Sequence, residues 1–221
     1  MTSQPLGPIA SVPECRLPTK QDHVGKNVTL VPLAKSHGRE LWQAAQGADE
    51  SWTYLGYGPF ESFETFEAHI AKLEQLADQP FFAVLSIDGK ATGWLSFCDI
   101  EPHNAALEIG SIWFAPVMQR TRATTEAIYL LIDHAFSIGF NRVAWRCNAL
   151  NTPSRDAALR LGFTYEGLWR QAQIIKGRWR DTAWYAQFVE DWPANKRRFE
   201  LWLADDNFDV DGHQRTSLRE L

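Results

Sequence analysis

The sequence predicts a mixed α/β fold of the α+β kind: a mostly antiparallel, twisted sheet with helices on both faces. Two β-rich runs flank Asp88-Gly89, a dipeptide typical of the tight turn between antiparallel strands. Residues 106–147 are patterned as strand, amphipathic helix and strand, an order that requires a parallel crossover. Helical patterns occur on either side of these strands, so helices are available for both faces of the sheet.

The N-terminal third is expected to hold an arm, a strand and two helices. Residues 1–27 are polar and rich in proline, which predicts an extended arm. Residues 28–33 form a short, β-branched run that predicts a strand. Helical patterns begin at Ser36 and again at Ser62. Between the two helices, residues 47–61 combine glycine, proline and aromatic residues, a composition typical of a long functional loop.

The remainder of the chain alternates between the two periodicities. Residues 81–87 and 91–99 are the strands of the antiparallel pair. The later elements are expected to be strands at 106–114, 142–147, 163–175 and 179–189, and helices at 121–139, 153–161 and 192–203. The resulting organisation is the arm (1–27), one folded domain (28–190), and a C-terminal helix with a loose acidic tail (191–221).

Composition excludes several classes of protein. The 221 residues are 45% apolar and 22% charged, the profile of a globular chain with a substantial core. The formal net charge of −5 argues against a nucleic-acid partner, which needs a basic surface. No apolar stretch is long enough to span a membrane. The three cysteines, Cys15, Cys98 and Cys147, are too far apart for a Cys-x-x-Cys site and suggest a cytoplasmic protein.

An anion site is expected where the strand 106–114 leads into the helix 121–139. The first backbone N–H groups of a helix lack partners within it, and the helix dipole favours negative charge there. Arg120 and Arg122 add two guanidinium groups that can hold phosphate oxygens. A solvated basic turn is the alternative interpretation of the same residues.

Two longer motifs resemble those of a known family. They are IGSIWFAPVMQRTRATTEAIYLL at 109–131 and NTPSRDAALRLGFTYEG at 151–167. On them the chain resembles the GNAT superfamily of acyl-CoA-dependent N-acyltransferases, nearest to the branch of ribosomal-protein amino-terminal acetyltransferases. The resemblance covers about residues 28–190. It implies direct transfer of an acetyl group from acetyl-CoA to a primary amine, either a protein N-terminus or a small amine, without a metal ion.

The resemblance also implies a set of coenzyme-binding residues. The family's pyrophosphate loop, Gln/Arg-x-x-Gly-x-Gly/Ala, corresponds to residues 119–124, although Arg122 and Thr124 occupy its two small positions. Backbone N–H groups of the preceding strand would polarise the thioester carbonyl, and Asn151 would contact the pantetheine arm. The implied residues are Ile112, Trp113, Phe114, Gln119, Arg120, Thr121, Arg122, Ala123, Thr124, Asn151 and Ser154.

Two catalytic residues follow with less direct support. Many members of the family protonate the departing thiolate with a tyrosine, but that position is Ala158 here, so the role is assigned to Ser154, which could equally be a helix-capping hydroxyl. The branch's glutamate base corresponds to Gln173, which cannot accept a proton. Glu108 is therefore the first candidate base, with Asp181 next. Strand alternation, barring a bulge, would place Glu108 on one face with Gly110, Ile112 and Phe114.

The acceptor pocket is expected between the aromatic loop and the last hairpin. Trp52, Tyr54 and Tyr57 of the 47–61 loop would form one wall, and Asp181 of the hairpin would lie opposite. A rival hypothesis is a non-catalytic acyl-CoA-binding or sensor module on the same fold, because four positions depart from the catalytic pattern. Assembly as a homodimer is left open.

Overall fold

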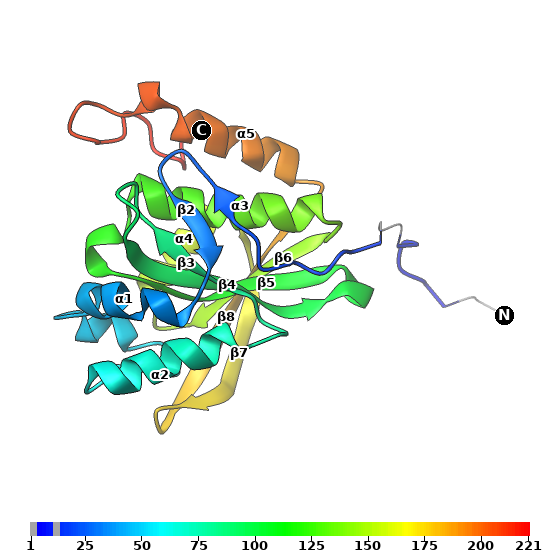
Figure 1. Ribbon diagram of the computed structural model, residues 1–221. Helices are drawn as coiled ribbons and strands as arrows, with labels where there is room; N and C mark the ends of the chain where they lie inside the picture. The colour runs from blue at the N-terminus through cyan, green and yellow to red at the C-terminus, as the bar shows by residue number, and fades with distance from the viewer. Residues whose placement is uncertain (1–3, 11–13) are drawn as a thin grey trace.

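The sheet is antiparallel at every junction except one. A computed structural model describes residues 4–10 and 14–221, and in these residues eight strands follow the order β1-β2-β3-β4-β5-β6-β8-β7 (Figure 1). Only β5 and β6 are parallel. The strands are β1 (His23–Val24), β2 (Thr29–Pro32), β3 (Phe81–Leu85), β4 (Ala91–Glu101), β5 (Ala106–Phe114), β6 (Arg142–Asn148), β7 (Thr164–Ile175) and β8 (Arg178–Phe188). The predicted mixed, mostly antiparallel sheet is confirmed.

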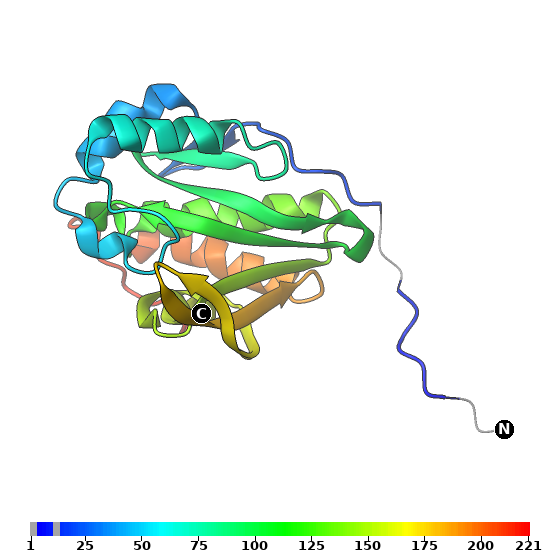
Figure 2. The same cartoon turned by 90° about the horizontal axis from the view of Figure 1, so that it is seen from below.

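Helices cover both faces of this sheet, as predicted. The helices α3 and α5 lie on one face, and α1 and α2 lie on the other (Figure 1), with the same layers seen from below in Figure 2. The helices are α1 (Gly38–Ala44), α2 (Phe63–Glu74), α3 (Arg122–Ser137), α4 (Thr152–Arg160) and α5 (Trp192–Leu203). Short 3-10 turns occur at Lys35–His37, Asp49–Trp52, Pro102–Asn104, Pro116–Met118 and Asp205–Asn207.

Each face of the sheet has its own apolar core. On the α3 side the core is aliphatic and aromatic, and includes Leu131, Ile132 and Phe199. On the α1 and α2 side a tryptophan cluster dominates, with Trp52 stacked on Trp113 at 4.6 Å between ring centroids. Burial of such large rings is the main stabilising contribution on this side. The aromatic loop is therefore held against the sheet by the contact of Trp52 with Trp113 of β5.

Both ends of the chain pack against the folded domain more closely than the sequence indicates. The arm expected over 1–27, of which residues 1–3 and 11–13 lie outside the described residues, adds β1 to the sheet beside β2. The C-terminal tail was expected to be loose, and this is wrong. Leu218 is 1% exposed in the core, and the buried Asn207 donates to the carbonyl oxygens of Trp202 and Thr216. These bonds hold the tail against α5.

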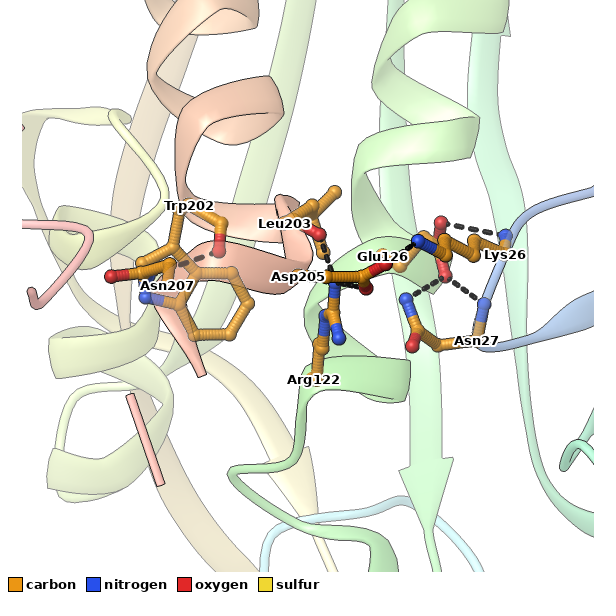
Figure 3. Close-up of polar contacts among 8 residues, drawn as sticks. All are labelled: Lys26, Asn27, Arg122, Glu126, Trp202, Leu203, Asp205 and Asn207. Carbon is orange, nitrogen blue, oxygen red and sulfur yellow. Dashed lines mark hydrogen bonds and ion pairs between the residues drawn. The ribbon is translucent and has the colours of Figure 1, made fainter. Parts of the chain in front are cut away.

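A buried carboxylate joins the N-terminal strands to α3. Glu126, 6% exposed, accepts hydrogen bonds from the backbone N–H of Lys26 at 2.8 Å and of Asn27 at 2.6 Å, and a third from the Asn27 side chain (Figure 3). Gly25 lies against the same carboxyl group, and a Cβ there would come within 2.7 Å of it. The turn between β1 and β2 is thus built around the Glu126 carboxylate.

Substitution of Glu126 by Ala is expected to destabilise the fold by about 2–4 kcal/mol, because it leaves the two backbone N–H groups without acceptors. Glu126→Gln, which retains one oxygen acceptor, should lose less. Urea denaturation would measure both values. The control is Glu61→Ala, an exposed acid before α2, which should change stability by less than about 0.5 kcal/mol. A Glu126→Ala variant as stable as this control would contradict the structural role.

Candidate active site

The one parallel pair in the sheet is also the place where the sheet opens. β5 and β6 pair only at Ala106, Leu107 and Glu108, opposite Arg142 to Ala144, and the rest of each strand diverges from the other. A cavity of about 410 Å³ lies at this divergence. Its walls come from β4, β5, β6, β7, β8, the start of α4 and the 51–57 loop. The cavity is large enough for part of a small-molecule ligand.

A β-bulge in β5 shapes the near wall. The register with β4 shifts between the pairs Trp94–Trp113 and Ser96–Gly110, and Ser111 has a left-handed φ of 50°. The extra residue reverses the alternation. Ile112 and Phe114 therefore pack on the α3 side, while Trp113 joins the tryptophan cluster. The expected common face for Glu108, Ile112 and Phe114 is thus wrong, because the bulge intervenes.

Glu108 is the buried acid of the cavity. It is 5% exposed and forms an ion pair with Arg146, which also pairs with Asp99. Burial raises the pKa of Glu108 to about 7, against the opposing attraction of Arg146. The carboxyl packs against Gly110, where a Cβ would lie 2.7 Å from its Oε1 and 2.7 Å from Cys98 Sγ, so a larger residue would not fit there. Glu108 can therefore exchange a proton near neutral pH.

Ser154 lines the same cavity from the first turn of α4. Asn151 caps this helix, accepting from the Ser154 backbone N–H at 3.2 Å. The Ser154 hydroxyl oxygen accepts from Trp145 Nε1 at 3.1 Å. An indole N–H can only donate, so the hydroxyl proton of Ser154 can bond to another acceptor, and the Cys147 thiol is within hydrogen-bonding reach. Asn151, Ser154 and Trp145 all line the cavity.

The expected anion loop leads into the first turn of α3. Thr121 caps the helix, with its hydroxyl accepting from the Thr124 backbone N–H at 3.3 Å. Arg120 has a left-handed φ of 62°. The two residues at the family's small positions bond to the protein itself. Arg122 donates to the Leu203 carbonyl and pairs with Asp205 (Figure 3), and the Thr124 hydroxyl bonds to the Met118 carbonyl.

The other predicted residues divide between the cavity and the core. Tyr54 and Tyr57 line the cavity. Trp52 does not; it is 1% exposed and packs under the loop, so its assignment to the pocket wall is corrected. Trp113 is likewise buried, with Nε1 donating to Ser51 at 2.9 Å. Asp181 lies in a separate cavity of about 280 Å³ and accepts from the Gln171 backbone N–H at 2.7 Å.

Several polar residues of the cavity were missed in the sequence. Arg146 lies on β6, and Arg180, Thr182 and Trp184 occupy alternate positions of β8. Alternation along 179–189 would have placed these three on one face. The sequence could not show that this face adjoins Glu108, because β8 reaches it only by pairing with β6.

A divided parallel pair, with a helix N-terminus after one strand and a second helix after the other, is the acetyltransferase architecture of the GNAT type. The family model for the acetyltransferase (GNAT) domain matches residues 27–164, more than half of the chain. The chain therefore belongs to the GNAT acetyltransferase family.

Individual relatives support this assignment. A ribosomal-protein-serine acetyltransferase of Escherichia coli (strain K12) is 26% identical over 179 residues, covering 78% of this chain and 98% of the relative. The crystal structure of a GCN5-related N-acetyltransferase from Brucella melitensis is 38% identical, with a TM-score of 0.90 over 95% of this chain and 96% of the other.

A more distant structure shares the fold alone. The microcin C7 self-immunity acetyltransferase, solved in complex with acetyl-CoA and AMP, is 24% identical, with a TM-score of 0.67 over 75% of this chain and 94% of the other.

Among the residues described here, no helix is both long and apolar enough to cross a membrane.

The raised pKa of Glu108 predicts a pH-dependent stability. In the unfolded chain a glutamate loses its proton near pH 4.5, but Glu108 in the folded protein keeps it until about 7. Protonated Glu108 therefore stabilises the folded protein fully below pH 4.5, and this contribution to the free energy of unfolding is lost as the pH rises to about 7. Relative to Glu108→Gln, the wild-type protein should lose about 3 kcal/mol across this window. Denaturant titrations at several pH values would show it, and a pH-independent difference would contradict the buried acid.

Proposed function

We propose that this protein is an acetyl-CoA-dependent N-acetyltransferase that transfers an acetyl group directly to a primary amine. The observation that carries the proposal is the cavity at the β5–β6 divergence, which is lined both by a buried acid with a pKa near neutrality and by a hydroxyl with a proton to donate. A proton acceptor and a proton donor in one cavity are what amine acylation by a thioester requires.

The residues around the cavity fit acetyl-CoA, which supplies an acetyl group activated as a thioester. Backbone N–H groups of the first turn of α3, together with Arg120, would hold the pyrophosphate. The Arg122 and Thr124 side chains are bonded within the protein, as described above. Asn151 and Ile112 would line the path of the pantetheine arm, since both border the cavity.

Glu108 accepts the proton of the incoming amine. An alkylammonium group must be deprotonated before its nitrogen can act as a nucleophile, and a base with a pKa near 7 is suited to this at neutral pH. Glu108 borders the cavity, so an amine that cannot reach the carboxyl directly would pass its proton through a water molecule held there.

Ser154 donates the proton that the departing thiolate needs. Its oxygen already accepts from Trp145, and a hydroxyl that accepts one hydrogen bond becomes a stronger donor of the next. The N-terminal position on α4 adds a favourable electrostatic field for negative charge on sulfur.

The acceptor is a primary amine on a protein N-terminus or a small molecule. The relative from Escherichia coli carries a ribosomal-protein substrate in its name, which supports the former. A cavity of this size admits a chain terminus as readily as a free amine.

The first test is acetyl-CoA-dependent release of free thiol with a panel of peptide and small amines. Glu108→Gln should lower the rate by roughly 10²–10⁴-fold, the usual contribution of a general base, and should remove the acidic limb of the pH–rate profile near pH 7. Acetyl-CoA should raise the melting temperature of both proteins. A melting shift without thiol release from any amine would favour the non-catalytic binding module instead.

Replacement of Ser154 by Ala should lower kcat more than it weakens acetyl-CoA binding, because the hydroxyl acts only as the thiolate leaves. The helix cap is retained, since it depends on the Asn151 side chain and the backbone N–H of residue 154. Steady-state kinetics and a thermal-shift titration together separate the two effects. Equal losses in turnover and binding would identify the hydroxyl as structural.

A further inference from the structure

The strand β8 presents to the cavity several buried polar groups that form no hydrogen bond with any described residue. Arg180, Thr182 and Trp184 alternate along β8 and line the cavity. Arg180 Nε, Thr182 Oγ1 and Trp184 Nε1 are shielded from solvent and have no hydrogen-bond partner in the described part of the chain. Thr182 is 4% exposed. Buried polar atoms without partners are costly, and their concentration on one wall indicates a polar ligand.

Arg146 and Arg180, the two arginines of the cavity, differ in whether their charge is paired. Arg146 is neutralised by Glu108 and by Asp99, and its guanidinium lies over the Trp184 ring at 4.8 Å. Arg180 forms no ion pair with any described residue, and burial lowers its pKa. A half-buried cation without a counter-ion favours an anionic ligand.

The acids that surround Arg180 are already engaged. Glu108 and Asp99 are paired with Arg146, and Asp181, next to Arg180 in sequence, accepts from the Gln171 backbone. The residue directly opposite Arg180 on β7 is Gln173, an amide without charge. Within residues 4–10 and 14–221, no acidic side chain therefore pairs with Arg180.

We infer that the Arg180 wall of the cavity binds a carboxylate carried by the acceptor amine. This inference rests on the proposed function and specifies its substrate class: a primary amine with a carboxylate a few bonds away. Its ammonium group would face Glu108 and its carboxylate would face Arg180. Arg180 and Glu108 line the same cavity of about 410 Å³, so one small zwitterion could contact both. A free amino acid and an acidic residue at a protein N-terminus share this chemistry.

The test compares matched acceptors that differ only in the carboxylate. Peptides beginning with Asp or Glu are paired with those beginning with Asn or Gln, and free alanine is paired with alaninamide. For the wild-type protein, kcat/KM should be about 10- to 100-fold higher with the carboxylate-bearing acceptor of each pair than with its uncharged partner. This is the difference expected for one charged hydrogen-bonded contact. The peptide and amino-acid arms distinguish the two sources of the carboxylate.

Arg180→Gln should remove this preference through KM, so that the two members of each pair are used with kcat/KM values within about two-fold of each other. Arg180→Lys should retain part of the preference, because the charge remains but the bidentate geometry is lost. Arg178→Gln is the matched control, an exposed arginine on the same strand that does not line the cavity. Thermal melts should show all three variants folded, since Arg180 has no ion pair to lose.

Two results would overturn the inference without affecting the proposed function: equal use of both members of each pair by the wild-type protein, or an equal loss for both in Arg180→Gln. Thiol release from none of the amines would instead reject the enzyme. In that case calorimetric titration with the same acceptors in the presence of CoA still decides the Arg180 contact. Binding of the carboxylates that is unchanged in Arg180→Gln would reject it.

Discussion

The short parallel contact between β5 and β6 is the constraint on which the rest of the structure depends. A crossover through α3 brings these strands together, and only three residue pairs hold them before they diverge. In a continuous sheet the N–H and C=O groups beyond Glu108 would pair across the gap. Here they border a cavity that the start of α4 also lines, through Asn151 and Ser154.

Charge inside this cavity is balanced unevenly. Glu108, Asp99 and Arg146 form a network in which one guanidinium serves two carboxylates, and burial still raises the pKa of Glu108 to about 7. That outcome depends on the Arg146 contact being insufficient to offset the desolvation of the acid. On β8, Arg180 also lines the cavity but forms no ion pair with any described residue. The cavity thus holds one arginine that is paired with two acids and a second arginine without an ion pair.

Much of the fold could be predicted from local patterns, but the site could be predicted only in part. The hairpin at Asp88-Gly89, the helix cap at Thr152-Pro153 and the crossover each depend on short-range signals. Glu108 could be selected because it is the one acid of its strand. The β5 bulge at Ser111 has no comparable sequence signal, and it reversed the side of Ile112. The role of Arg180 depends on β8 lying beside β6, a long-range pairing that periodicity does not specify.

Arg122, which departs from the glycine of the family's pyrophosphate-loop motif, is held by contacts with the C-terminal part of the chain. A bulky residue at a glycine position would ordinarily block close approach to the backbone. Arg122 instead extends to the Leu203 carbonyl and Asp205, and its guanidinium lies over the Phe208 ring at 4.3 Å. These contacts require the tail to be folded, which the buried Asn207 and Leu218 ensure. Leu203, Asp205 and Phe208 therefore hold the Arg122 side chain against the end of α5 and its tail.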